Sequence, residues 1–143
     1  MNRERAQYWG QYMRDLADRL ELRDWTVTCD RDYAQPPYGA TADCTYGRKS
    51  ITVAVCAGFD DWPPERQRQT IVHELLHAHT ARTSRLLHEV RETVGKYWVG
   101  QLDTTIRQDL EYAIDAIACA LDQHMPLPPT DRPRKQKKHG GKK

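Results

Sequence analysis

The sequence lacks the long apolar run that a membrane-spanning helix needs. No stretch of its 143 residues approaches the ~20 consecutive apolar residues that cross a bilayer. The first residues are polar and charged, without the apolar segment of a secretory signal. None of the four cysteines belongs to a C-x-x-C pair, which argues against a thiolate metal site or a redox motif. We therefore expect a cytoplasmic protein that has no membrane partner.

Length and charge predict one folded domain followed by a basic tail. A chain of this length buries a core without disulfide or metal staples, and 38% hydrophobic with 29% charged residues is typical of a globular protein. Residues 126–143 hold seven Lys or Arg and one Asp, with too few apolar side chains to pack. We expect residues 1–125 to form the domain and residues 126–143 a disordered tail. The tail suggests weak contact with nucleic-acid phosphates, with a solubilising extension as the alternative. The sequence does not indicate an oligomeric state.

Apolar periodicity predicts an α+β fold. A repeat of apolar side chains at every fourth position predicts an amphipathic helix over residues 5–22. Apolar and polar residues then alternate in three segments, at residues 25–29, 40–46 and 51–55, as in half-buried strands. A glycine-containing turn at residues 46–50 joins the last two strands as a hairpin. We expect a small three-stranded antiparallel sheet.

Three further helices are predicted after the sheet. The first spans residues 63–82, and the second spans residues 85–97. The third begins near Thr104 or Thr105, where Thr105 and Gln108 fit a capping box; its apolar stripe ends at Leu121. The first of these helices carries the main motif of the chain, and the other two are expected to cover it.

That motif is H-E-x-x-H, formed by His73-Glu74-Leu75-Leu76-His77. On a helix, His73 and His77 project to the same side one turn apart, so both imidazoles reach one zinc ion. Glu74 lies about 100° round the helix from His73, where it stands beside the metal without binding it. It is then placed to act as the general base towards the attacking water. We expect one Zn²⁺ per chain and a catalytic role for Glu74; the alternative is a pair of helix histidines without a metal.

A zinc site of this kind needs a third protein ligand, and Glu111 is the best candidate. It borders the apolar stripe of the last predicted helix, so it is able to face inward. Asp115 lies one turn later on the same side, where it is expected to accept an N–H from a zinc-bound histidine and fix its orientation. Glu89, Glu92 and His88 on the preceding helix remain competitors for the ligand position.

These residues resemble the motifs of the zincin metallopeptidases. The segment from Ile71 to Ala78 carries the H-E-x-x-H helix, and the later Glu111 and Asp115 with Met125-Pro126 resemble the gluzincin branch, and within it the ImmA/IrrE-like compact metallopeptidases. The resemblance covers roughly residues 50–126. It implies a zincin-like fold with zinc ligands at His73, His77 and Glu111, and with Glu74 as the base.

A second resemblance and a second class of function stay open. His-Glu-Leu-Leu-His-Ala is also similar to SprT-type proteases, which act on DNA-bound proteins and take a third histidine as ligand. The prediction is a zinc metallopeptidase that hydrolyses a peptide bond in a protein or peptide, held as an extended strand against residues 50–56. The alternatives are such a SprT-like protease, or a non-catalytic module that contains zinc or binds nucleic acid or protein. Four side chains are candidates for stabilising the oxyanion, and the sequence does not choose among them: Arg82, Arg85, Tyr97 and Tyr112.

Overall fold

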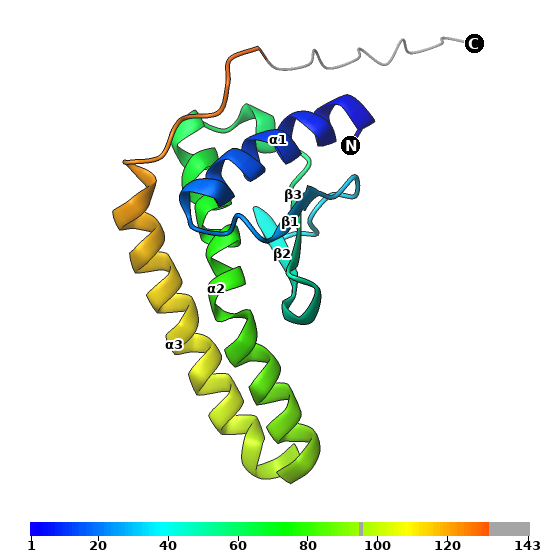
Figure 1. Ribbon diagram of the computed structural model, residues 1–143, viewed down its shortest axis with the longest axis vertical. Helices are drawn as coiled ribbons and strands as arrows, with labels where there is room; N and C mark the ends of the chain where they lie inside the picture. The colour runs from blue at the N-terminus through cyan, green and yellow to red at the C-terminus, as the bar shows by residue number, and fades with distance from the viewer. Residues whose placement is uncertain (95, 132–143) are drawn as a thin grey trace, which may run out of the picture.

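The structure, a computed structural model, describes residues 1–94 and 96–131, with side chains throughout except at 94, 96–99 and 101. It is an α+β fold of three α-helices and one small sheet (Figure 1). In chain order the elements are α1 (Arg3–Arg19), β1 (Thr26–Cys29), β2 (Ala40–Thr45), the 3-10 turn η1 (Tyr46–Arg48), β3 (Ser50–Val55), the 3-10 turn η2 (Phe59–Asp61), α2 (Pro64–Val94) and α3 (Lys96–Asp122).

The N-terminal helix is confirmed. Asn2 caps it by accepting a hydrogen bond from the Arg5 backbone N–H at 2.9 Å, which satisfies one of the free donors at the helix start. Glu21 adopts a positive φ of 58° just after the helix, a conformation that turns the chain away from the helix axis. The buried side of α1 contributes Trp9, Met13 and Leu16 to the core.

The three strands are confirmed, but the expectation of an antiparallel sheet is wrong. The strand order is β1-β3-β2, with β3 antiparallel to β2 and parallel to β1. The short turn between β2 and β3 forces those two strands to run in opposite directions. Residues 30–39 link β1 to β2, and this link is long enough to carry β2 beyond the position next to β1. The strand β3 then takes that central position. The strand at residues 50–56, expected at the sheet edge, is therefore the central strand, and β1 and β2 are the two edge strands, of which β2 lies beside α2.

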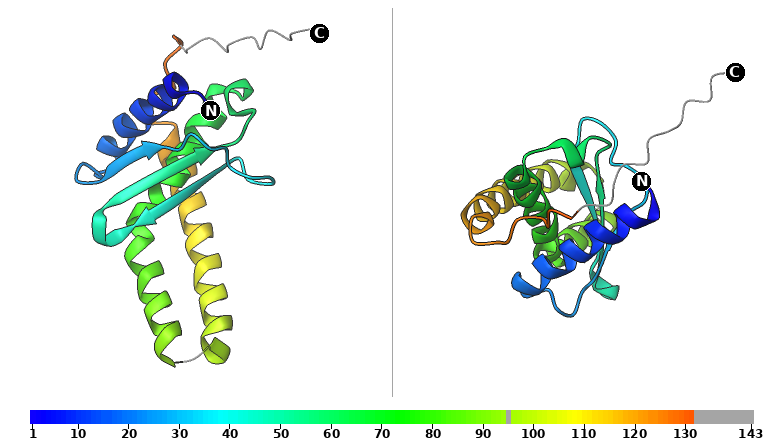
Figure 2. Two further views of the ribbon diagram at one scale, coloured as in Figure 1. Left: turned by 90° about the vertical axis from the view of Figure 1, so that its right-hand side faces the viewer. Right: turned by 90° about the horizontal axis from the view of Figure 1, so that it is seen from above.

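One face of the sheet packs against the helices, and the other faces solvent (Figure 2). Alternate residues of β3 are fully buried on the helix side, namely Ile51, Val53 and Val55. On the opposite face the hydroxyl groups of Thr28 and Thr52 lie 3.1 Å apart at an exposed position. The alternation read from the sequence thus corresponds to one buried and one exposed face.

The two helices expected at residues 63–82 and 85–97 are one helix of 31 residues, α2. Neither glycine nor proline occurs between Glu65 and Val94, so no residue breaks the backbone hydrogen bonding. The last helix begins at Lys96, well before the expected start, so Thr105 and Gln108 lie inside α3 rather than at its cap. The antiparallel pair α2 and α3 projects beyond the sheet as a long hairpin (Figure 1).

The first residues after α3 pack on α1. The Tyr12 hydroxyl donates a hydrogen bond to the Pro126 carbonyl at 2.8 Å, and the Tyr8 hydroxyl donates one to the Pro129 carbonyl at 2.5 Å. Pro128, which lies between these two prolines in the sequence, is buried. The folded body therefore includes the beginning of the segment expected to form a tail. The basic residues of that tail, at 132–143, lie outside the described residues, so its expected disorder and nucleic-acid contact stay predictions.

No helix in the described part of the chain combines the length and the apolar character required to cross a bilayer.

Candidate metal centre

The candidate centre lies between α2 and α3, where the two helices run antiparallel beside the sheet. His73 and His77 stand one turn apart on α2, and Glu111 and Asp115 stand one turn apart on α3. The intervening turn of α2 is anchored in the core by Leu75, which is fully buried. The α3 helix is anchored by buried Ile114, next in sequence to Asp115. Each pair of polar side chains is thus fixed by an apolar neighbour on the same helix turn.

The distances within this group fit a shared metal ion better than direct hydrogen bonds. Nε2 of His73 lies 3.5 Å from Oε2 of Glu111, and Nε2 of His77 lies 3.7 Å from Oε1 of Glu111. Both separations exceed the 2.7–3.2 Å of an N–H···O hydrogen bond. Two ligand atoms of a tetrahedral zinc ion are separated by about 3.3 Å, given bonds of about 2.0–2.2 Å. All three ligand atoms lie within 4.8 Å of one another, so small side-chain rotations bring them to one ion.

Asp115 lies where a residue that orients a metal ligand is needed. Its Oδ1 is 2.8 Å from Nδ1 of His73, on the side of the ring away from Glu111. A proton on Nδ1 is then donated to Asp115, and Nε2 keeps its lone pair towards Glu111 and His77. This is the arrangement that fixes the tautomer of a metal-binding histidine.

Glu74 is a buried carboxyl group beside the cluster, with 7% of its surface exposed. Burial raises its pKa to about 7, and the nearby Glu111 adds to the rise. His73 and a hydrogen bond from the Ala42 backbone N–H on β2 act in the opposite direction. The carboxyl is therefore held between α2 and the edge strand, with a pKa in the range in which a carboxyl group accepts and returns a proton near neutral pH.

The protonation state of His77 also suits a ligand. Burial lowers the pKa of its imidazole, although Glu111 favours the charged form. The neutral imidazole, which has a free nitrogen lone pair, is the form that binds metals. The two histidine rings lie with centroids 5.0 Å apart and nearly perpendicular, so the rings do not stack.

The other ligand candidates from the sequence do not join this group. Glu89 bonds to Arg85 at 2.8 Å on the exposed surface of α2, and Glu92 is exposed further along the same helix. His88 lines the pocket beside the site but is not one of the three converging ligands. His79 points away, with its Nε2 2.9 Å from the Leu20 carbonyl. In the described residues the third converging group is a glutamate rather than the histidine of the SprT type.

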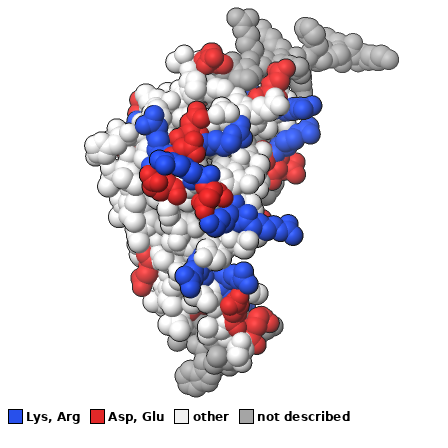
Figure 3. Space-filling view, viewed as in Figure 1, with Lys and Arg blue, Asp and Glu red and all other residues white. Residues whose placement is uncertain are grey.

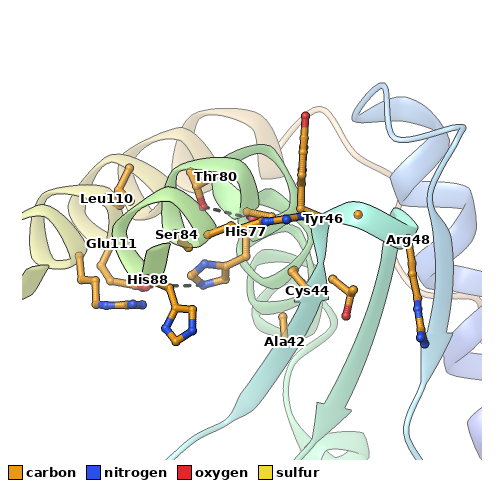
Figure 4. A pocket seen from close by; sticks show the side chains of 15 residues that line it. Ala42, Cys44, Tyr46, Arg48, His77, Thr80, Ser84, His88, Leu110 and Glu111 are labelled. Carbon is orange, nitrogen blue, oxygen red and sulfur yellow. Dashed lines mark hydrogen bonds and ion pairs between the residues drawn. The ribbon is translucent and has the colours of Figure 1, made fainter. Parts of the chain in front are cut away.

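A pocket of about 750 Å³ opens beside His77 and Glu111. Figure 4 shows His77, Glu111 and His88 on one side of it, and Ala42 and Cys44 of β2 on the other. The cluster is thus at the surface of a cavity rather than enclosed by protein, and Glu111 remains 52% exposed at its side chain.

Two features of the site were not predicted from the sequence. Arg107 lines the pocket one turn before Glu111 on α3, and its four-residue spacing from Glu111 is the signal that would have identified it. The Ala42 backbone N–H beside Glu74 has no signal in the sequence, because it depends on which strand takes the sheet edge. Among the oxyanion candidates, Arg85 lines the pocket and Arg82 does not. Tyr112 is 68% exposed, and the side chain of Tyr97 lies outside the described residues.

Comparisons of the chain with protein-family models, curated proteins and solved structures find no match.

Proposed function

We propose that the protein is a zinc-dependent metallopeptidase of zincin type, with His73, His77 and Glu111 as metal ligands and Glu74 as the general base. One observation carries the proposal. The structure brings the two histidines of the motif together with a glutamate from another helix, at distances suited to a shared ion, and places a buried carboxyl group beside them.

The open pocket favours catalysis over a purely structural metal. Structural zinc sites are closed by four protein ligands, whereas catalytic sites have three protein ligands and one open position. Here three ligand groups converge, and the cavity beside them is large enough for part of a peptide. A zinc ion bound there would polarise a substrate carbonyl and lower the pKa of a coordinated water to about 7.

The residues around the ion have separate roles in this proposal. Glu74 accepts the proton of the attacking water, and the Ala42 backbone N–H holds its carboxylate in place. Asp115 holds His73 in the tautomer that leaves Nε2 free. Glu74 thus transfers a proton, whereas Ala42 and Asp115 orient neighbouring side chains.

The edge of β2 is the proposed binding site for an extended peptide. In the described residues no strand pairs with the outer side of β2. The Cys56 N–H bonds to the Gly39 carbonyl at 2.8 Å, so by alternation the backbone groups of Ala42 and Cys44 point outward. The Ala42 N–H already donates a hydrogen bond to the Glu74 carboxyl group. The next residue of β2 whose backbone groups point outward is Cys44, which lines the pocket (Figure 4). A substrate strand paired there lies alongside His77.

Metal analysis and a substitution test the proposal together. The purified protein should contain about one zinc per chain and cleave some members of a random library of quenched-fluorescence octapeptides, and a chelator should abolish that cleavage. Glu74→Gln should retain zinc and lose about 10²–10⁴-fold in turnover, because the amide has the shape of the carboxylate but does not accept the proton. Glu92→Gln, an exposed change on the same helix, is the matched control.

Two results would separate the proposal from its rivals. A folded protein that binds no zinc would favour the non-catalytic binding module. Zinc retention with unchanged cleavage in Glu74→Gln would refute the assigned mechanism.

A further inference from the structure

The pocket extends from the metal ligands along the α2–α3 hairpin, away from the sheet. On α2 it is lined at intervals of about one turn by His77, Ala81, Ser84 and His88. The opposite wall is the η1 turn that joins β2 to β3. A substrate that enters past the metal ligands therefore places its next residues between these two walls.

Basic side chains outnumber acidic ones among the residues that line the pocket. Its lining contains three arginines, Arg48, Arg85 and Arg107, and one acidic residue, Glu111, which the proposal assigns to the metal. Arg107 is four residues from Glu111 on α3, about 6 Å along the helix axis. Arg85 is eight residues from His77 on α2, about 12 Å along the axis. Figure 3 shows Lys and Arg side chains above and below the notch between the sheet and the hairpin, with acidic side chains beside them.

Two of these arginines are held in place through one nitrogen. Arg85 donates from Nε to Glu89 at 2.8 Å, and Arg107 donates from Nε to Asp103 at 2.9 Å. In the described part of the chain, neither guanidinium forms another ion pair or hydrogen bond through its terminal nitrogens. Those nitrogens are the fork that binds a carboxylate with two parallel hydrogen bonds.

Arg85 also reaches across the pocket to the opposite wall. A Cβ atom built on Gly47 of η1 would lie 3.3 Å from Nη1 of Arg85. The guanidinium thus lies close to the turn, in space that a larger residue at position 47 would crowd. Arg85 spans the pocket from α2 to η1 at the end away from the metal ligands.

From this arrangement we propose that the pocket selects peptides with a carboxylate about two to four residues from the cleaved bond, bound by Arg107 and Arg85. The inference rests on the proposed peptidase function and specifies its substrate class. The carboxylate belongs either to an Asp or Glu side chain or to the C-terminus of the peptide. Both have the same chemistry, and the axial separations of about 6 Å for Arg107 and about 12 Å for Arg85 correspond to about two and about four extended residues, at about 3.3 Å per residue.

Binding to the Glu74→Gln protein loaded with zinc tests the proposal without requiring cleavage. The probes are pairs of octapeptides with blocked ends that differ only by Glu or Gln at one position, scanned along the peptide. A second set has a free C-terminal carboxylate in place of the amide. At one or two adjacent positions the Glu peptide should bind about tenfold or more tightly than the Gln peptide, as expected for charge-assisted hydrogen bonds. A preference confined to the second set would identify the C-terminus as the source.

Substitutions then locate the preference. Arg85→Gln and Arg107→Gln should each reduce the ratio of Glu to Gln affinity, and the double variant should bring it close to one. Arg107→Lys should restore part of it, because the charge returns without the fork. Arg82→Gln, exposed on α2 and outside the pocket, should leave the ratio unchanged.

Two results would overturn the proposed carboxylate site even if the protein cleaves peptides. One is equal affinity for Glu and Gln peptides at every position. The other is stronger competition by a single-stranded oligonucleotide than by any Glu peptide. Failure of the proposed function gives a different result. A clear Glu preference in a protein whose wild-type form cleaves no peptide would leave the pocket assignment intact and refute the peptidase.

Discussion

In the metal-free protein, Glu74→Gln should increase stability at pH 8 and leave it nearly unchanged at pH 4. The folded state raises the pKa of Glu74 from 4.5 to about 7, chiefly by burial and then by the neighbouring Glu111. A carboxyl group with a raised pKa contributes stability below its unfolded pKa, and that contribution is lost as pH rises through the folded value. At about 1.4 kcal/mol per pH unit, the ionised carboxylate costs the folded state about 3 kcal/mol at pH 8. The amide has the same shape and carries no such cost.

Urea unfolding at pH 4, 5, 6, 7 and 8 with a chelator present measures this effect. The difference in unfolding free energy between Glu74→Gln and the wild type should grow between pH 5 and pH 7 and level off by pH 8. Other groups also titrate in this range, including His77, whose lowered pKa reduces stability as pH falls below the unfolded value. The contribution of groups that do not interact with Glu74 is common to both proteins and cancels in the difference, whereas the interaction of Glu74 with His73 and Glu111 is part of the difference itself.

Two further measurements make this prediction refutable. Glu92→Gln, at an exposed position on the same helix, should show no such pH-dependent gain. Added zinc should shrink the difference, because a nearby cation favours the charged carboxylate. A difference between Glu74→Gln and wild type that is constant from pH 4 to pH 8 would show that folding does not raise the pKa of Glu74 and would weaken the basis for its assigned role.

Three other predictions follow from the contacts of α3 and of the segment after it. Glu111→Ala should lose zinc readily under mild chelation, followed by metal analysis, whereas Glu89→Ala should retain it; the opposite order would remove Glu111 from the ligand set. Asp115→Ala should weaken zinc affinity about 10–100-fold in a competition titration with a chromogenic chelator, because His73 loses its orienting partner; unchanged affinity would contradict that role. Deleting residues 132–143 should leave the unfolding free energy in urea unchanged, whereas deleting residues 126–143 should lower it by about 1–2 kcal/mol through the lost hydrogen bonds to α1; equal stability of the two truncations would show that this contact is not stabilising.

The strands were predictable from the sequence and their order was not, for a physical reason. Alternation of apolar and polar residues reports only that one face of a strand is buried, and Val53 would alternate with its neighbours in either strand order. The direction of pairing between β1 and β3 depends on how the link at residues 30–39 crosses the sheet. The same information decides which strand is at the edge, so both the Ala42 contact to Glu74 and the Cys44 edge position were outside the reach of the sequence pattern.

The helix error had a different origin. Apolar repeats predicted one helix that ends at residue 82 and a second that begins at residue 85, whereas a helix ends where a residue interrupts its hydrogen bonding or a cap replaces it. Thr83 and Ser84 do neither strongly, and α2 continues to Val94. This affects the candidate site, because an unbroken α2 carries Glu89 about 18 Å along the axis beyond His77, out of reach of the group formed by His73, His77 and Glu111.

The same continuity explains why Glu111 and Asp115 meet the histidines. Helix α2 ends at Val94, α3 begins at Lys96, and the two helices run antiparallel, so residues at similar distances from these two ends face each other. His77 and His73 stand 18 and 22 residues before position 95, and Glu111 and Asp115 stand 16 and 20 residues after it. Each pair has the same four-residue spacing, so one turn of α2 faces one turn of α3. The acidic pair was identified in the sequence from its place beside an apolar stripe, and the positions at which α2 ends and α3 begins bring it opposite the two histidines.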